Sequence, residues 1–228
     1  MVRRAKVKKE HYMSLIRFFH GCAQLGDISI SVGGIPVARQ LSYGEATPHF
    51  LVRPGQTQIR VEEKGVVRLQ NHVIVPEEET YTVLILCRES FPEMIAIAED
   101  GRLLDLEQSG VRVGSFAQSN EQLQLWRRFA ETDELLFEQI ERGDVSEYVQ
   151  LEPGHNRFEI REGNAAISML PGQVIEKGQL YTLYIIGKND PEEDEYPVAI
   201  ILLPDVATNF PQPHLIENTG GESGKNQP

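Results

Sequence analysis

An internal duplication constrains the fold of this chain more than any other feature of its sequence. The stretch "GEATPHFLVRPGQTQIRV" begins at Gly44 and "GDVSEYVQLEPGHNRFEI" begins at Gly143, so the two align without a gap at an offset of 143 − 44 = 99 residues. The same order continues downstream, where "VIVPEEETYTVLIL" from Val73 corresponds to "VIEKGQLYTLYII" from Val174. A chain that repeats a whole series of segments is built from two copies of one structural unit.

Each copy has the sequence pattern of β-structure. Ile28, Ile30 and Val32 alternate with serines, which places the three apolar side chains on one face of a half-buried strand. Gly33–Gly34 is typical of a tight hairpin because glycine tolerates positive φ angles, and Pro54–Gly55, which recurs in the second copy, marks a turn between strands. Short strands separated by turns every 8 to 12 residues or so predict an all-β sandwich.

The duplication therefore predicts two tandem β-sandwich domains. At 228 residues the chain is long enough for two units of roughly 100 residues each. The last segment is rich in Pro, Gly, Asn and Gln and is expected to be disordered. We expect a basic N-terminal arm at residues 1–13, a first sandwich at 14–100, a linker at 101–109, a second sandwich at 110–205 and a C-terminal tail at 206–228. The linker residues expected to pack at the domain boundary are Leu103, Leu104 and Leu106.

One segment of the second copy supports two interpretations. Taken by themselves, residues 120–142 have apolar side chains at a helical spacing and contain no proline. The repeat, however, aligns Leu123 and Leu125 with Ile28 and Ile30 of the first copy. We favour strand, loop and strand over this segment, with a helix as the alternative.

Four stretches of the first copy form a pattern: "IRFFHG", "GDISISVGGIPV", "LSYGEATPHFLVRPGQTQIRV" and "YTVLIL". With this pattern, both copies resemble a bacterial family known as domain of unknown function 4397, and the resemblance covers most of the chain from Leu15 to Asp205 in outline. It implies sandwiches of immunoglobulin-like or transthyretin-like type, often in tandem, and it implies no activity. The sequence departs from the family pattern after His20, where "HGCAQLGD" replaces a proline-bearing loop, and at Ser115–Phe116, where the second copy lacks the histidine.

Charge and hydropathy exclude two classes of partner. The net charge of −12 and a pI near 5.0 disfavour binding to nucleic acid, and the basic stretch "MVRRAKVKKE" is interpreted as a solvated arm. No apolar run approaches the roughly 20 residues that a membrane-spanning helix needs. The sequence leaves the partner unknown, with a protein or a carbohydrate as the two candidates.

The N-terminus and the cysteines bear on the compartment. No apolar core follows the basic N-terminal residues, so a secretory signal peptide is not expected and the cytoplasm is the default location, with cell-surface association left open. The chain has two cysteines, Cys22 and Cys87. The reducing cytoplasm would keep both as free thiols, whereas export by another route would allow them to form a disulfide.

Motifs for catalysis are absent from the sequence. It contains no Gly-x-Ser-x-Gly elbow, no His-Glu-x-x-His and no Cys-x-x-Cys, so we predict no catalytic residue and no cofactor. A metal site built from His20 and Cys22 with Cys87 or His49 lacks a paired spacing, and the acidic loop at residues 189–197 lacks the spacing of an EF-hand. We therefore predict no metal site.

The best candidate for a recognition patch is the sequence from Trp126 through Arg127 and Arg128 to Phe129. An aromatic residue combined with arginines is typical of binding hot spots. The alternative is structural, because a single tryptophan in a small sandwich commonly anchors the core. Either way, these four residues are the ones that the sequence nominates.

The sequence as a whole predicts a non-catalytic binding or structural module. A first alternative is a carbohydrate-binding or cell-surface protein, which requires an exposed aromatic platform around Trp126 or Tyr196. A second alternative is an enzyme that uses His20, His49 or the acidic loop in an unfamiliar arrangement, which requires at least two of these groups to converge.

Overall fold

The computed structural model describes residues 13–88, 91–101, 107–118, 122–188 and 196–206, and this part of the chain folds into strands without any helix. In the first half the strands are β1 (Ser14–His20), β2 (Ile28–Val32), β3 (Ile35–Leu41), β4 (Phe50–Val52), β5 (Gly55–Glu63), β6 (Val66–Val75), β7 (Thr80–Arg88) and β8 (Phe91–Ala98). In the second half they are β9 (Ser109–Ser115), β10 (Leu123–Phe129), β11 (Thr132–Ile140), β12 (Val149–Leu151), β13 (Gly154–Glu162), β14 (Ala165–Ile175), β15 (Leu180–Ile186) and β16 (Ala199–Asp205).

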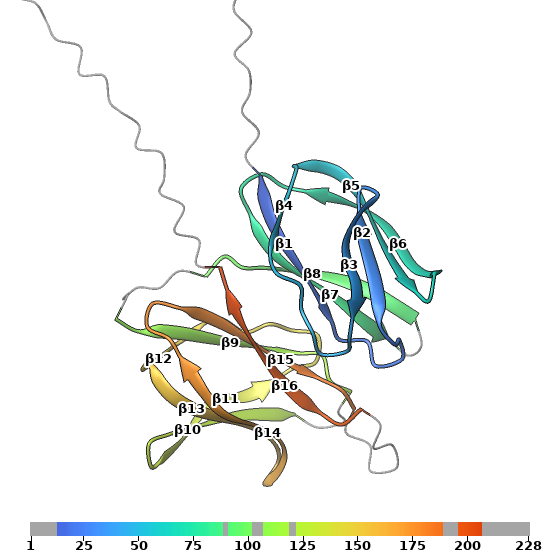
Figure 1. The fold of residues 1–228 in the computed structure, drawn as a ribbon. Coiled ribbons are helices and arrows are strands. Elements are labelled where there is room, and N and C mark those ends of the chain that lie inside the picture. Colours follow the sequence, from blue (N-terminus) through green and yellow to red (C-terminus); the bar gives the residue numbers. More distant parts are fainter. Residues whose placement is uncertain (1–12, 89–90, 102–106, 119–121, 189–195, 207–228) are drawn as a thin grey trace, which may run out of the picture.

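The two halves have the same topology, as the internal repeat predicts. The first sandwich pairs a sheet of order β4-β1-β7-β8 with one of order β3-β2-β5-β6, and the second pairs β12-β9-β15-β16 with β11-β10-β13-β14. In each, the first and seventh strands run parallel and the other pairs are antiparallel. Figure 1 shows the two sandwiches side by side, the first in blue to green and the second in green to red. The prediction of an all-β fold with two sandwich domains is confirmed.

The described part of the segment at residues 120–142 contains the strands β10 and β11, so the helical alternative is wrong. Leu123 and Leu125 are buried in the core of the second sandwich, whereas Gln124 and Trp126 point to its outer face. This alternation has the period of two that a strand imposes. The turn between the two strands contains Ala130 at a φ of 52°.

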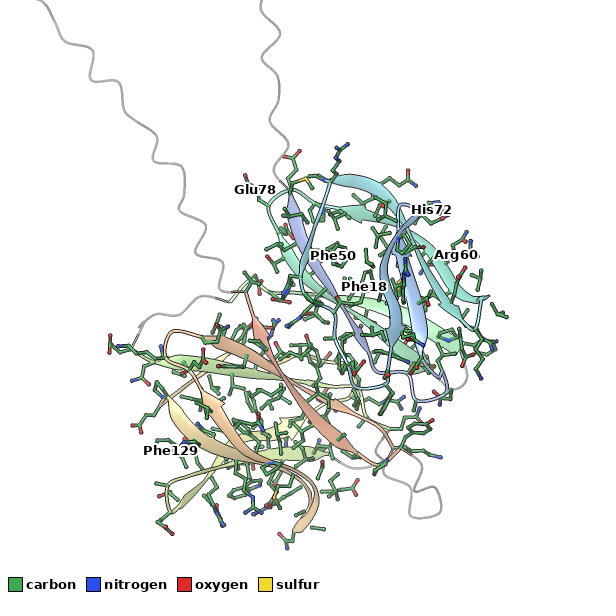
Figure 2. All side chains as sticks on the ribbon, viewed as in Figure 1. Phe18, Phe50, Arg60, His72, Glu78 and Phe129 are labelled. Atoms are coloured by element: carbon green, nitrogen blue, oxygen red, sulfur yellow. A yellow bond between two sulfur atoms is a disulfide. The ribbon has the colours of Figure 1, made fainter. Side chains whose placement is uncertain are left out.

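Each sandwich has its own hydrophobic core. Phe18 of the first sandwich is completely buried, and the ring of Phe50 from the short strand β4 stacks on it with the centroids 5.9 Å apart (Figure 2). In the second core, Phe158 of β13 is likewise completely buried. Cys22 and Cys87 form a disulfide, which ties the loop after β1 to the end of β7 across a separation of 65 residues. The pairing that the sequence left open is therefore present.

A third hydrophobic cluster joins the two sandwiches. Phe19, Leu84 and Leu86 of the first sandwich pack against Tyr184 and Ile186 of the second, and the rings of Phe19 and Tyr184 stack at 5.2 Å. Because β7 and β15 pack against a core on both faces, their sequences read as continuous apolar runs instead of alternating.

A buried polar network lies at the same interface. Arg17 of β1 is 3% exposed, and its Nε donates to Thr82 Oγ1 at 2.6 Å within its own sandwich. Its Nη2 donates to Asp205 Oδ1 at 2.8 Å and its Nη1 donates to the Pro204 carbonyl at 2.6 Å, both at the end of the last strand of the second sandwich.

The second copy makes the reciprocal contacts. Arg112 of β9 donates through Nε to Thr182 Oγ1 at 2.9 Å and through Nη2 to the Ala98 carbonyl at 2.8 Å, which lies at the end of β8. Each arginine thus binds a threonine of its own sandwich and the end of the last strand of the other. The duplication extends to the surface through which the copies associate.

Two buried carboxylates complete the network. Glu99 accepts hydrogen bonds from Thr82 at 2.5 Å and His49 at 3.0 Å, and Arg17 lies 3.2 Å away. Burial opposes its ionisation, but the bond from His49 and the charge of Arg17 outweigh burial and lower the pKa of Glu99. Burial, together with the charge of Glu99, raises the pKa of Asp205. Two carboxyl groups in one site resist ionising together, which explains the opposite directions.

Candidate functional site

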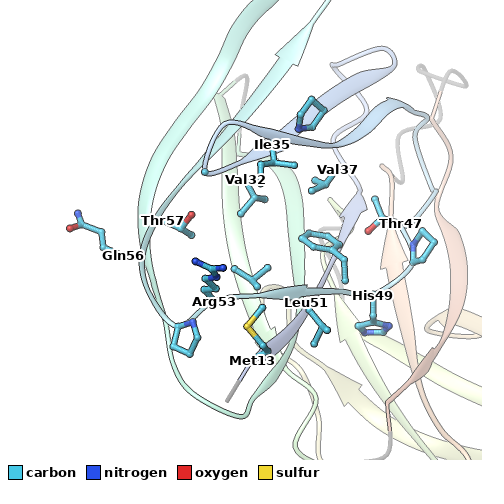
Figure 3. Close-up of a pocket in the computed structure, with 16 residues that line it drawn as sticks. Met13, Val32, Ile35, Val37, Thr47, His49, Leu51, Arg53, Gln56 and Thr57 are labelled. Atoms are coloured by element: carbon cyan, nitrogen blue, oxygen red, sulfur yellow. The ribbon is translucent and has the colours of Figure 1, made fainter. Parts of the chain in front are cut away.

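A cavity of about 860 Å³ opens in the first sandwich between the edge strands of its two sheets, β3 and β4 (Figure 3). We call it the β3–β4 cavity. Strand β4 is only three residues long and lies between Pro48 and Pro54, so the sheet edge that it forms is short. The apolar side chains that line the cavity include Val32, Ile35, Val37, Phe50, Leu51 and Val52.

The apolar lining runs from the solvent to the core. Ile35 is 69% exposed and Leu51 is 63% exposed, whereas Val32 and Val52 are 7% and 8% exposed and belong to the core of the first sandwich. Large apolar side chains grouped around a concave surface are characteristic of binding sites. The volume also falls in the range of roughly 300 to 1,000 Å³ that small-molecule sites occupy.

Polar groups are few in the β3–β4 cavity, and two of them already have partners. Thr47 Oγ1 accepts a hydrogen bond from the Phe18 backbone N–H at 3.0 Å, and His49 donates to Glu99. Arg53, by contrast, is exposed and makes no hydrogen bond or ion pair with any described residue. Its guanidinium is therefore available to a ligand.

The corresponding position of the second sandwich is filled. Val32 pairs with Ile35 across the β2–β3 hairpin, and Arg127 pairs with Glu134 at the same place in the β10–β11 hairpin. Arg127 is 5% exposed and lies over the ring of Phe129, with its guanidinium carbon 4.5 Å from the ring centroid. A buried arginine thus stands where the first sandwich has a valine.

The side chains around Arg127 have changed together with it. Its Nε donates to Asn156 Oδ1, its Nη2 to the Glu152 carbonyl at 3.0 Å and its Nη1 to Glu134 at 3.2 Å. At the repeat offset of 99 residues, the counterparts of these three partners are Thr57, Arg53 and Ile35. The β3–β4 cavity is therefore a feature of the first sandwich and not a consequence that the fold imposes on both.

The predicted recognition patch is divided between two faces of one strand. Trp126 and Arg128 lie on the outer face of the second sandwich, whereas Arg127 is buried inside it, because successive residues of a strand point in opposite directions. The four residues, Phe129 included, do not form one surface, although a binding role for Trp126 and Arg128 stays a prediction. The interpretation of Trp126 as a core anchor is wrong for the same reason.

The outer face around Trp126 already carries internal contacts. The guanidinium carbon of Arg161 lies 4.4 Å from the centroid of the Trp126 ring, and Arg128 forms an ion pair with Asp133 at 2.6 Å. Tyr196 packs edge-on against Tyr43 at 5.3 Å. The aromatic faces that a sugar would stack on are thus partly occupied by other side chains.

The histidines named in the sequence lie in separate environments. His20 is buried, which lowers the pKa of its imidazole, and its Nε2 lies 3.0 Å from the Gly26 carbonyl oxygen. Cys22 and Cys87 are joined in the disulfide, so neither offers a thiolate to a metal beside His20. Within the described ranges, no three His, Cys, Asp or Glu side chains are grouped to hold a metal ion.

Most of the acidic loop, residues 189–195, lies outside the described part of the chain, as do residues 102–106 of the linker, 1–12 of the arm and 207–228 of the tail.

Sequence reasoning missed the β3–β4 cavity, although a signal for it exists. The repeat aligns Ile35 with Glu134 and Leu51 with Gln150, so two apolar residues of the first copy have polar counterparts in the second. Such differences between otherwise equivalent positions mark where one copy has acquired a feature that the other lacks.

Comparison with known proteins finds a family model that matches part of the chain. Residues 14–126 match the family model described as a domain of unknown function (DUF4397), which covers the first sandwich and extends into β10 of the second. No curated protein matches the chain. The chain is similar to a crystal structure of a candidate cell adhesion protein from Bacteroides ovatus, at 9% identity and a TM-score of 0.27 over 86% of this chain and 96% of that one. It is also similar to a candidate cell adhesion protein from Bacteroides eggerthii, at 8% identity and a TM-score of 0.22 over 89% of this chain and 98% of that one. Over residues 14–126, just under half of its length, the chain is therefore similar to the family described as a domain of unknown function (DUF4397).

Proposed function

We propose that the protein is a non-catalytic binding module in which the β3–β4 cavity of the first sandwich receives an apolar ligand. The observation that carries the proposal is the contrast between the copies. Ile35 and Leu51 are exposed around an open space in the first copy, while Arg127 and its polar partners fill the equivalent place in the second. Exposed Ile and Leu side chains each gain about 1.5–3 kcal/mol when they are fully buried, so a ligand that covers them is stabilised.

The second sandwich serves as a rigid support for this site. The hydrophobic cluster around Phe19 and Tyr184 and the reciprocal contacts of Arg17 and Arg112 fix the two sandwiches to each other. Among the lining residues, His49 links the cavity to this interface through Glu99. A site on a fixed scaffold loses less entropy when it binds its ligand.

The chemistry of the cavity narrows the partner classes expected from the sequence. An apolar lining suits a small apolar molecule or the apolar side chain of a protein, whereas a sugar needs polar partners for its hydroxyl groups. The net charge of −12 continues to disfavour nucleic acid. The described part of the chain contains no helix that could cross a membrane.

We also propose that the protein functions in an oxidising compartment and not in the cytoplasm that its N-terminus suggested. The disulfide between Cys22 and Cys87 supports this location, because structural disulfides persist where thiols are not kept reduced. Association with the cell surface is compatible with it.

The proposal is tested by titrating the protein with Nile red, a neutral dye whose fluorescence rises in an apolar site. The test variant carries Ile35→Glu and Leu51→Gln, which introduce the residues of the second copy at exposed positions and so preserve folding. The control carries Val174→Glu and Met169→Gln, at exposed apolar positions of β14.

We expect the wild type and the control to bind one dye molecule with similar affinity. The test variant should bind at least about tenfold more weakly, because two apolar contacts are lost. Absence of binding to the wild type, or equal affinity of the test variant and the wild type, would contradict the proposal.

A further inference from the structure

We infer that the ligand of the β3–β4 cavity is an anionic amphiphile, a molecule with an apolar tail and a single anionic head such as a carboxylate, and that Arg53 binds the head. This inference rests on the proposed function and names the class of ligand. The charged residues that line the cavity support it. The described residues that line the cavity include Arg53 but no Asp or Glu, although the chain as a whole carries a net charge of −12.

Arg53 is placed to meet the head of a molecule whose tail lies in the cavity. It follows directly after Val52, whose side chain reaches the core, and precedes the turn at Pro54. Figure 3 shows Arg53 and Thr57 on the same side of the cavity, with Ile35 and Val32 nearby. The site therefore presents an apolar surface and a cation next to each other.

The guanidinium of Arg53 is unpaired among the described residues, unlike those of Arg60 and Arg68 in the same sandwich. Arg60 forms an ion pair with Glu62, and Arg68 forms one with Glu63 at 2.7 Å. An unpaired guanidinium offers a planar fork of N–H donors that matches a carboxylate or phosphate in geometry. Arg53 has these donors free at the edge of the cavity.

The second copy supports the link between the cation and the open cavity. The counterpart of Arg53 is Glu152, at the offset 152 − 53 = 99, so the charge is inverted where Arg127 fills the space. The first copy thus has an exposed cation beside the open cavity, whereas the second has an acidic residue at that position and fills the space with the side chain of Arg127.

The edges of the cavity are poorly suited to an added peptide strand. Pro36 lies within β3, and the pairing of β3 with β2 shifts register twice. Pro48 and Pro54 flank the three residues of β4. Prolines and bulges on an edge interrupt the ladder of backbone hydrogen bonds that strand addition requires, so recognition falls to the side chains.

The experiment compares three ligands that share one tail: dodecanoate, dodecanol and dodecyltrimethylammonium. Each displaces Nile red from the full chain below its micelle concentration, at low and at high salt. The protein variants are Arg53→Gln, which removes the charge, and Arg53→Glu, which introduces the residue of the second copy. Arg88→Glu is the matched control, because Arg88 is 76% exposed and does not line the cavity.

We expect the wild type to bind dodecanoate about tenfold more tightly than dodecyltrimethylammonium, with the difference reduced at high salt. Arg53→Gln should abolish this preference and Arg53→Glu should reverse it, while Arg88→Glu keeps it. Equal binding of all three ligands by the wild type and by both Arg53 variants would overturn the anionic head and leave the apolar site standing. Failure of every ligand and of Nile red to bind would overturn the proposed function as well.

Discussion

Replacing Arg17 with methionine removes one of the two buried arginines that join the sandwiches. Arg17 lies 2.8 Å from Asp205 and 3.2 Å from Glu99, and the side chains of both carboxylates are almost completely buried. Methionine retains most of the apolar stem but leaves these two carboxylates without their shared partner. Breaking a buried ion pair by removing one partner costs about 3–5 kcal/mol, and we expect the free energy of unfolding to fall by that amount at pH 7.

The assay is urea unfolding followed by circular dichroism, with Arg128→Met as the control. Arg128 pairs with Asp133 on the surface, where it is 52% exposed, so its loss should cost less than about 1 kcal/mol. The two variants remove the same charge and differ in burial. A deficit below about 1 kcal/mol for Arg17→Met would refute the claim that the network holds the sandwiches together.

The loss in free energy of unfolding that Arg17→Met causes should also depend on pH. In the wild type the lowered pKa of Glu99 contributes stability above its unfolded-state pKa, and this contribution is lost as the pH falls. Without Arg17, burial dominates and raises the pKa of Glu99 as well as that of Asp205. Protonation then favours the folded variant, so its deficit should shrink as the pH falls toward about 4. A deficit that stays constant or grows on acidification would contradict this account.

Two further predictions concern covalent and backbone constraints. Replacing Cys22 and Cys87 by serine should lower the free energy of unfolding by about 4 kcal/mol, because the disulfide closes a loop of 65 residues in the unfolded chain; equal urea midpoints for this variant and the wild type would argue against it. Gly187→Ala should lower the free energy of unfolding by about 1–3 kcal/mol more than Gly143→Ala does. Both glycines have positive φ, but a Cβ at Gly187 would lie 2.3 Å from the Pro197 carbonyl oxygen, whereas a Cβ at Gly143 would have no atom within 4 Å. Equal melting temperatures of the two alanine variants would show that this contact is relieved.

Much of the fold could be predicted from the sequence because its signals are local or repeated. Alternation at Ile28 and Ile30 identifies a strand by itself, and the repeat transfers that assignment to Leu123 and Leu125 against a competing helical pattern. The apolar run in β7 indicates burial on both faces, but it does not say against what.

The interface between the sandwiches could not be predicted in the same way. Arg17 and Asp205 are 188 residues apart, and no local pattern indicates that an arginine in one copy binds a carboxylate in the other. The four residues of the predicted recognition patch are divided between two faces for a simpler reason, because Arg127 points inward between Trp126 and Arg128. The binding role of the patch was predicted from composition alone. The burial of Arg127 depends instead on its partners Asn156 and Glu152, which are distant in the sequence.

Methyl-resolved NMR of the full chain titrated with Nile red shows whether the first sandwich, and not the second, holds the binding site. We expect shifts at Val32, Ile35 and Leu51, which line the β3–β4 cavity, and unchanged signals at Val149 and Leu151 of β12, the strand that corresponds to β4. Shifts concentrated at Val149 and Leu151, or equal shifts in both sandwiches, would contradict this expectation.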